Sequence, residues 1–502
     1  MKYEIKSVLS EGYVKAKAIS FKFHSDNEEV LSKEREFEKL EMAIGKTKTQ
    51  FERMIDENND LSDYLNILIL IATDPELKKN CQSRIKIGLS AKGALYDVMN
   101  KTNSEILKST SSYLRERTSD VSDVLLRIAS NIDNKNEFTE IDDFILRTEI
   151  LYPSFLIQKR KNLVGVIVDK GGYTSHAAIM CRAFDIPLVI SDCDIKYGDT
   201  VIIDSRKKII DVNPSSEDIK EFDKEYEIRN SYPKHAISHE GFKFLANVST
   251  NYELDKVLDY GFDGIGLYRT EMIFMYNDRP YSFDEQKTIY TEAVEKLKDK
   301  TIVFRTFDVG DDKNLSYLRV EDKGVRNYFN NPVIFETQVK AILSSNKYDN
   351  LSIMFPMIET YKDFKELRKW VIKIAKKNKY KIPKIGMMLE TKSALETIKK
   401  FKHVDFISVG TNDLSKELYN VDRNQGVSDI SYARDLTKKL SVVVAYAAKK
   451  KISLSICGEL ASIKDVAIMF YKIGVRNLSV SPSLIRILNM SLEEFKNIPD
   501  KK

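Results

Sequence analysis

The chain has 502 residues, which is long for a single hydrophobic core, so two to four domains are expected. Hydrophobic residues make up 42% and charged residues 31% of the sequence, a composition typical of an ordinary soluble protein. The net charge of +5 is spread through lysine-rich helical segments, so the sequence gives no evidence for nucleic-acid binding.

The sequence lacks the patterns of secreted, membrane-spanning, disulfide-rich and zinc-binding proteins. Neither end shows the pattern of a signal peptide, and no stretch approaches about 18 uninterrupted apolar residues, so we predict a cytoplasmic protein without membrane insertion. The four cysteines are too few and too scattered for a disulfide framework, and no CxxC pair indicates zinc. Each is expected to be a free thiol.

The first part of the chain combines short β-like segments with one long helical region. Residues 1–20 are β-like, residues 28–133 carry apolar positions at helical spacing, and strand-like runs return at 145–150, 163–168, 188–190 and 201–203. The simplest interpretation is a small α/β domain built from residues 1–20 plus 142–214, with a helical domain at 21–141 inserted into it. A charged, helix-prone linker at 215–240 follows.

The sequence GGYTSHAAIM at residues 171–180 places one histidine, His176, between a glycine turn and an apolar run suited to a helix. Thr174 and Ser175 can cap a helix or bind a phosphoryl oxygen, and a helix N-terminus favours anionic charge. This pattern predicts a nucleophilic histidine that carries a phosphoryl group. A plain turn with a helix cap and an uninvolved histidine explains these few residues equally well.

Residues 241–502 alternate eight short apolar runs with amphipathic helical segments. The predicted strands are 244–248, 264–268, 302–304, 351–355, 385–389, 406–409, 454–456 and 477–480. Eight such alternations over this length predict a (β/α)8 barrel like that of TIM. A doubly wound open sheet is less favoured, because no glycine-rich phosphate fingerprint follows the first strand.

Polar side chains follow five of these strands, at the face where barrels carry their active sites. Arg269 and Arg305 offer planar guanidinium groups for phosphate and carboxylate oxygens. Glu390 and Asp413 are oxygen ligands suited to Mg2+, so a small phosphorylated carboxylic acid is the predicted ligand. The thiol of Cys457 is a candidate proton donor or acceptor, although a small buried hydrophobic residue is the commoner role.

Taken together, these segments resemble enzyme I of the bacterial phosphoenolpyruvate-dependent sugar phosphotransferase system over nearly the whole chain. GGYTSHAAIM is similar to the phosphohistidine motif, and GIGLYRTE and FRTFDVG are similar to the first two arginine motifs. GMMLET, SVGTNDL, NVDR and CGEL are similar to the metal, phosphate and proton-donor segments. SSYLRERTSDVSDVL and DPEL in the helical insert are also similar, and pyruvate phosphate dikinase and phosphoenolpyruvate synthase do not share them.

The resemblance implies a complete reaction. His176, supported by Thr174, would attack the phosphorus of phosphoenolpyruvate, and Cys457 would protonate the enolate at C3 to give pyruvate. Glu390 and Asp413 would hold Mg2+, and the phosphoryl group would be bound by Arg269, Arg305, Arg423 and Asn412. The helical insert would dock the phosphocarrier protein HPr, the linker would act as a hinge, and the barrel domain would form a homodimer.

Four departures from the family pattern motivate an alternative. Residues 310–313 read Gly-Asp-Asp-Lys instead of Gly-Gly-Asp-Lys, and the added Asp311 would repel an anionic ligand. Arg326 lies in a shortened counterpart of a substrate loop, and Leu68 replaces a typical histidine of the HPr-binding surface. The chain ends soon after residues 481–483, so changes in the last barrel helix and the dimer contact are expected. These differences also fit a regulatory or partner-binding paralogue.

Overall fold

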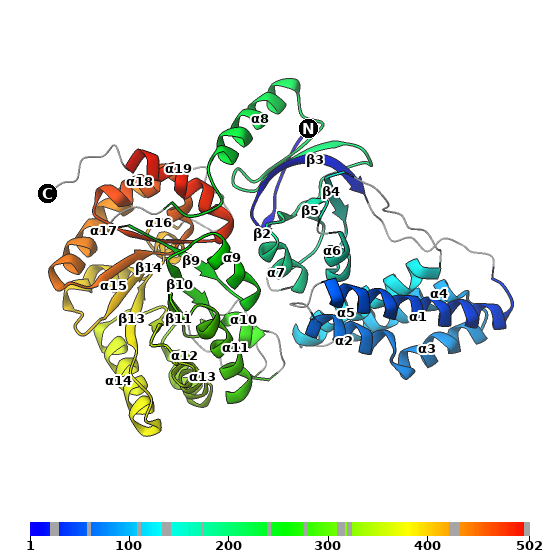
Figure 1. Cartoon of the computed structure of the whole chain (residues 1–502), viewed down its shortest axis with the longest axis horizontal. Coiled ribbons are helices and arrows are strands. Elements are labelled where there is room, and N and C mark those ends of the chain that lie inside the picture. The colour runs from blue at the N-terminus through cyan, green and yellow to red at the C-terminus, as the bar shows by residue number, and fades with distance from the viewer. Residues whose placement is uncertain are drawn as a thin grey trace. The chain divides into compact units, whose positions relative to one another are not determined.

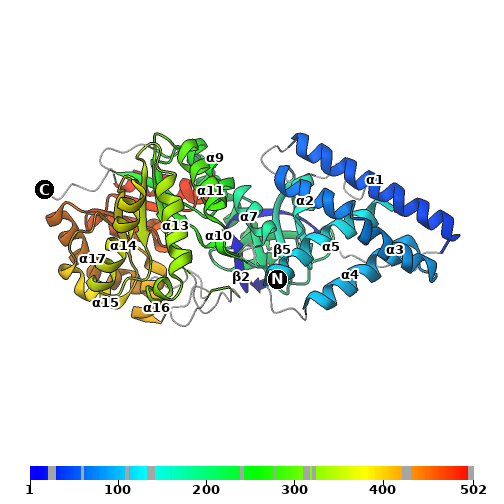
Figure 2. The same cartoon turned by 90° about the horizontal axis from the view of Figure 1, so that it is seen from below.

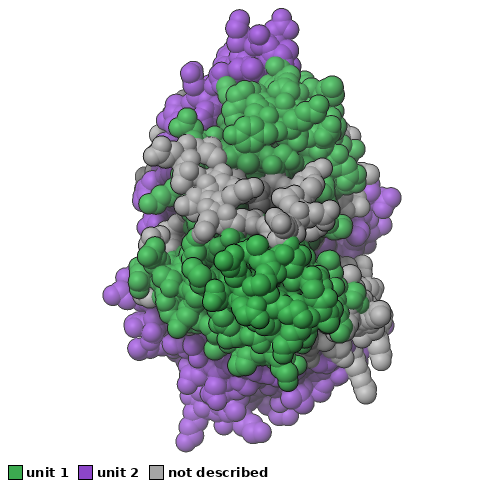
Figure 3. Space-filling model, turned by 90° about the vertical axis from the view of Figure 1, so that its right-hand side faces the viewer, with its two compact units in different colours: residues 1–214 green, residues 215–502 purple. Residues whose placement is uncertain are grey.

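The computed structural model describes residues 1–20, 30–57, 62–107, 112–132, 142–159, 161–172, 175–237, 242–275, 279–308, 317–318, 324–420 and 431–495. The chain divides into two compact units, Met1–Pro214 and Ser215–Lys502, which Figure 3 colours separately. Within the described residues no helix is both long enough and apolar enough to span a bilayer.

The first unit is built on a mixed sheet of eight strands. The strands are β1 (Lys2–Glu4), β2 (Ser7–Ser10), β3 (Tyr13–Ser20), β4 (Phe144–Thr148), β5 (Leu163–Val168), β6 (Leu188–Ile190), β7 (Thr200–Asp204) and β8 (Ile209–Val212). They lie in the order β1-β8-β7-β3-β4-β5-β6-β2, with parallel pairing from β3 to β6 and antiparallel pairing elsewhere. We did not predict β8, which follows β7 directly after the turn at residues 205–208.

Alternation along the central strands explains why this sheet is covered on both faces. On β4, Ile145 packs into one apolar cluster while Leu146 packs into the other, and Ile167 and Val168 divide in the same way on β5. Successive side chains of a strand point to opposite faces, so both faces are buried. Two short helices, α6 (Pro153–Lys159) and α7 (His176–Ala183), belong to the same unit.

In its described residues the inserted region is helical, and its helices lie side by side in Figures 1 and 2. They are α1 (Lys33–Glu57), α2 (Ser62–Ala72), α3 (Pro75–Lys86), α4 (Ala91–Leu107) and α5 (Ser112–Ile132). The DPEL segment begins α3, where Asp74 caps the helix and Pro75 takes a position that needs no N–H donor. Leu68 is fully buried in the core of the insert, so its side chain does not contribute to a docking surface.

The second unit opens with α8 (Ser216–Ser231), which starts from a capping box between Ser215 and Asp218. A closed barrel of eight parallel strands follows, as predicted. Its strands are β9 (Lys243–Val248), β10 (Gly264–Arg269), β11 (Thr301–Arg305), β12 (Leu351–Phe355), β13 (Lys384–Leu389), β14 (Phe406–Val409), β15 (Ser453–Ile456) and β16 (Asn477–Val480).

Helices α9 to α19 surround this barrel (Figure 1). They are α9 (Leu254–Asp259), α10 (Glu271–Met275), α11 (Phe283–Lys296), α12 (Arg326–Asn330), α13 (Pro332–Ser344), α14 (Tyr361–Asn378), α15 (Lys392–Thr397), α16 (Thr411–Tyr419), α17 (Ser431–Lys450), α18 (Lys464–Lys472) and α19 (Ile485–Phe495).

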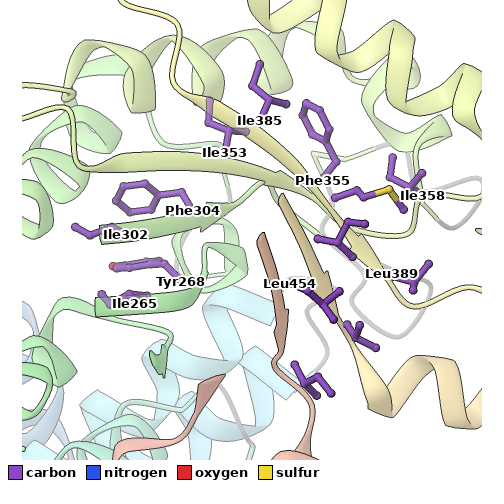
Figure 4. Packing of buried hydrophobic residues seen from close by; sticks show 14 of the residues in the cluster. Ile265, Tyr268, Ile302, Phe304, Ile353, Phe355, Ile358, Ile385, Leu389 and Leu454 are labelled. Atoms are coloured by element: carbon purple, nitrogen blue, oxygen red, sulfur yellow. The ribbon is translucent and has the colours of Figure 1, made fainter. Parts of the chain in front are cut away.

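Two apolar clusters stabilise the barrel. Figure 4 shows side chains of the larger one, among them Tyr268, Phe304 and Phe355, along the strands beneath the surrounding helices. A small second cluster takes side chains from strands around the barrel and fills its interior, and it comprises Leu267, Met354, Met388, Phe406 and Cys457. Cys457 follows β15 at the carboxyl ends of the strands, so it lies against a packed barrel interior rather than in a water-filled pore.

A helix closes the barrel at its C-terminal end, where the sequence had left the last barrel helix in question. After β16 the chain forms α19, and its Ile485 and Leu488 are buried. The Asn489 side chain donates 2.8 Å hydrogen bonds to the carbonyl oxygens of Pro233 and His235 and accepts one of 3.0 Å from the Ile237 N–H. The helix therefore anchors the segment that follows α8.

Candidate active site at the carboxyl ends of the barrel strands

The barrel gathers most of the predicted side chains at one end. Arg269 ends β10 and Arg305 ends β11, while Glu390 follows β13 directly. Asn412 and Asp413 lie in the first turn of α16, after β14, and Cys457 follows β15. Because parallel strands of a barrel end at the same face, these groups share one site.

Arg305 is held by several partners. Its Nη2 donates to Glu271 Oε1 at 2.7 Å, and its Nη1 lies 3.2 Å from Asp308 Oδ2 and 3.6 Å from Met388 Sδ. Burial by itself lowers the pKa of this guanidinium. The negative charges of Glu271, Asp308 and Glu390 raise it by more, so the pKa lies above its ordinary value. Arg305 is therefore a fixed, permanent cation whose Nε donates to none of the described residues.

Glu390 is a buried carboxylate with one satisfied oxygen. Its Oε1 accepts a 2.6 Å hydrogen bond from the Met357 N–H, whereas its Oε2 accepts none from the described residues. Burial first, and then the charges of Asp308 and Asp413, raise the pKa of Glu390 to about 8. Met357 itself adopts a left-handed backbone conformation, with φ of 50°, which is uncommon for a residue with a side chain.

These carboxylates fit a divalent cation. The charges of Asp308 and Asp413 act on the Glu390 carboxyl, and its Oε2 accepts no hydrogen bond from the described residues, so it lacks the partner that a buried carboxylate needs. The part of the chain that the structure describes has no preformed cluster of three or more histidine, cysteine or acidic ligands. Mg2+ is commonly held by one or two carboxylates together with substrate oxygens, so two protein ligands suffice.

Cys457 carries a protonated thiol at neutral pH. Its side chain is buried, and its Sγ lies 3.5 Å from the Val409 carbonyl oxygen as a hydrogen-bond donor. Burial raises the pKa of the thiol to about 11, although Ser408, Arg269 and Arg305 act in the opposite direction. The raised pKa suits the proton-donor role of the two predicted for this thiol, and both roles stay predictions.

The oxygen and the nitrogen of the Asn412 side-chain amide both form hydrogen bonds with Glu459. Its Nδ2 donates to Glu459 Oε1 at 3.0 Å, and its Oδ1 accepts from the Glu459 N–H at 2.9 Å. Glu459 follows Cys457 by two residues, so this pair joins the loops after β14 and β15.

The remaining predicted residues lie elsewhere or outside the described residues. His176 is the first residue of α7, and Ser175 caps that helix by accepting from the Ala178 N–H at 3.2 Å. Thr174, Arg423 and Asp311 fall outside the described residues. Arg326 is an exposed residue at the start of α12.

Four residues of the site were given no role of their own from the sequence: Glu271, Asp308, Met357 and Glu459. The first two and Glu459 stand inside recognised segments, at the strand ends where charges were expected. What the sequence lacked was any sign that they contact other predicted residues, because those contacts join different strands. Met357 acts through its backbone N–H, which no side-chain pattern reveals.

Comparisons with known proteins identify the family. The PEP-binding domain of PEP-utilising enzymes matches residues 224–496, the mobile domain matches 141–208, and the N-terminal domain matches 7–117. A phosphoenolpyruvate-protein phosphotransferase from Borreliella burgdorferi is 32% identical over 88% of this chain and 85% of its own length. The chain belongs to the phosphoenolpyruvate-protein phosphotransferase family, enzyme I.

Other members of the enzyme I family show the same extent of similarity. The phosphotransferase from Bacillus subtilis is 29% identical over 95% of this chain and 92% of its own length. The one from Mycoplasma capricolum is 33% identical over 78% of this chain and 74% of its own length. The likeness therefore covers both units of the chain.

Proposed function

We propose that this enzyme I family member transfers the phosphoryl group of phosphoenolpyruvate to its own His176 and then to the histidine of an HPr-like phosphocarrier protein. Pyruvate is released, and the transfer is the first step of sugar uptake by the phosphotransferase system. The observation that carries this proposal is the buried Arg305, fixed by Glu271 and Asp308 beside Glu390 and Cys457 at one end of the barrel.

Substrate binding follows from the charges at this end. Phosphoryl transfer is catalysed mainly by positioning and by neutralising charge on the phosphoryl oxygens. Arg305 keeps its charge, and its Nε–H donates to none of the residues that the structure describes, so it suits a phosphoryl oxygen. Arg269, Asn412 and Arg423 complete the proposed binding groups for the phosphoryl group, and Arg326 is a further candidate.

The chemical step forms one bond and breaks another. A ring nitrogen of neutral His176 attacks phosphorus, and the bond between phosphorus and the enol oxygen breaks. The electron pair returns to the enolate, whose C3 takes the proton of the Cys457 thiol. Glu390 and Asp413 would hold Mg2+, which supplies charge neutralisation at the substrate oxygens when bound.

The first unit would carry the phosphoryl group. As the first residue of α7, His176 stands where the helix N-terminus favours an anionic group, and Thr174 and Ser175 precede it. The helical insert at 21–141 would bind the HPr-like protein, and residues 215–240 would serve as the hinge. Homodimer formation through the barrel unit stays a prediction.

Labelling with radioactive phosphoenolpyruvate and Mg2+ tests the proposal. We expect an acid-labile label on the wild-type protein that passes to added HPr, no label on His176→Ala, and normal labelling of His403→Asn. His403 is a suitable control because it is exposed, lies in the barrel unit outside the hinge, and has a positive φ that asparagine tolerates. Equal labelling of His176→Ala would contradict the proposal. Binding of phosphoenolpyruvate without any labelling of wild type would favour the regulatory paralogue.

A further inference from the structure

Glu459 makes a reciprocal contact with Asn412 that no part of the proposed chemistry uses. The Glu459 carboxylate accepts from Asn412 Nδ2 at 3.0 Å, while the Glu459 N–H donates to Asn412 Oδ1 at 2.9 Å. Glu459 opens the short helix Glu459–Ser462 after β15, and Asn412 lies in the first turn of α16. The two residues thus join neighbouring strand ends of the barrel.

This contact fixes which side of the Asn412 amide is presented to a ligand. A backbone N–H can only donate and an ionised carboxylate can only accept, so the oxygen of the amide must face the Glu459 N–H. Its nitrogen must face the Glu459 carboxylate. One of the two Nδ2 hydrogens is used in this contact, and within the described part of the chain the second has no acceptor. An anionic phosphoryl oxygen is the kind of group that such a donor binds.

Glu459 is not needed to hold the two loops together. The Cys457 N–H donates to the Val409 carbonyl oxygen at 3.0 Å, and Gly458 packs directly against Thr411. The Glu459 side chain itself is exposed. Removing it should leave the fold intact and keep the Asn412 amide bonded to the Glu459 N–H through its oxygen, while Nδ2 loses the acceptor that fixes its direction.

We propose that Glu459 is a positioning residue for phosphotransfer, which acts by orienting the Asn412 amide toward the phosphoryl group. The inference rests on the proposed function, because Asn412 has a phosphoryl group to bind only if phosphoenolpyruvate occupies the barrel. Glu459 does not touch the reacting atoms. Its effect passes entirely through Asn412.

The test is a double-mutant cycle in the full-length protein. Initial rates of labelling by phosphoenolpyruvate with Mg2+ give kcat/KM for wild type, Glu459→Ala, Asn412→Ala and the double variant. We expect Glu459→Ala to lower kcat/KM about tenfold, the size of one hydrogen bond to a charged group. The double variant should match Asn412→Ala within about twofold, because residues that act as a unit are not additive. Glu459→Gln keeps an acceptor and should recover most of the loss.

Glu292→Ala is the matched control. Glu292 also accepts from an asparagine side chain, Asn251 Nδ2 at 2.8 Å, but it lies on α11. This variant should label as wild type does, and all variants should keep the wild-type Tm. Fully additive losses in the cycle, or wild-type kinetics for Glu459→Ala, would overturn the positioning role. Failure of wild type to label would instead overturn the proposed function.

Discussion

At the scale of single residues, Glu390 combines a proposed role in binding Mg2+ with a cost in stability. Its pKa is raised from 4.5 to about 8, first by burial and then by Asp308 and Asp413. Between these values the folded protein binds a proton that the unfolded chain has released. The contribution of Glu390 to stability therefore falls as the pH rises from 4.5 to about 8, and it stays low above that pH.

Replacing Glu390 by glutamine should remove this loss. In EDTA, the Tm of the barrel unit in Glu390→Gln should exceed that of wild type at pH 8.5 by at least about 2 °C, and the two values should converge near pH 4.5. Added Mg2+ should raise the Tm of wild type at pH 8.5 and leave the Tm of the variant unchanged. The rate of phosphotransfer by the variant should fall about 100-fold or more. Calorimetry between pH 4.5 and 9 checks this. Parallel curves for the two proteins would contradict it.

At the scale of elements, the turn after β15 has no space for a side chain. A Cβ on Gly458 would lie 1.8 Å from Thr411 Oγ1 and 2.6 Å from the Thr411 backbone nitrogen. Because backbone cannot move aside as a flexible side chain can, Gly458→Ala must push the loops after β14 and β15 apart. We expect a loss of about 2–3 kcal/mol in the free energy of unfolding, together with weaker phosphotransfer.

Gly45→Ala is expected to stabilise the protein, in contrast to Gly458→Ala. Gly45 is exposed within α1, and nothing lies within 4 Å of its would-be Cβ. Alanine there should stabilise the first unit by about 0.5–1 kcal/mol, because glycine is the poorer helix former. Midpoints of urea unfolding, followed for each unit, measure both effects. Destabilisation by Gly45→Ala would contradict the open position of Gly45, and a neutral Gly458→Ala would contradict the close contact of Gly458 with Thr411.

The elements were easier to predict from the sequence than the contacts between their ends. The eight barrel strands were predicted to within about two residues, because buried parallel strands are short apolar runs between long amphipathic helices. The contact of Arg305 with Glu271 depends on the parallel register of β10 and β11, in which Arg269 pairs with Arg305. Such registers join residues far apart in the sequence, so the local pattern contains neither this ion pair nor the contact of Asn412 with Glu459.

At the scale of the whole molecule, the two units have separate hydrophobic cores. The largest apolar cluster lies wholly within residues 242–488, and the two clusters of the first unit lie within residues 5–212. Each unit therefore has the buried apolar surface that an independent domain needs. A chain of this kind need not unfold in one step, so the two units can respond differently to a ligand.

Ligand binding should separate the two unfolding transitions. In the His176→Ala variant, which cannot consume phosphoenolpyruvate, the substrate with Mg2+ should raise the Tm of the 215–502 unit and leave that of the 1–214 unit unchanged. At a concentration of 100 times Kd the gain is about 2.7 kcal/mol, enough to resolve two peaks by scanning calorimetry. Residues 215–502 produced alone would assign the shifted peak. A shift confined to the 1–214 transition would contradict substrate binding at the barrel, since a ligand stabilises only the unit that binds it.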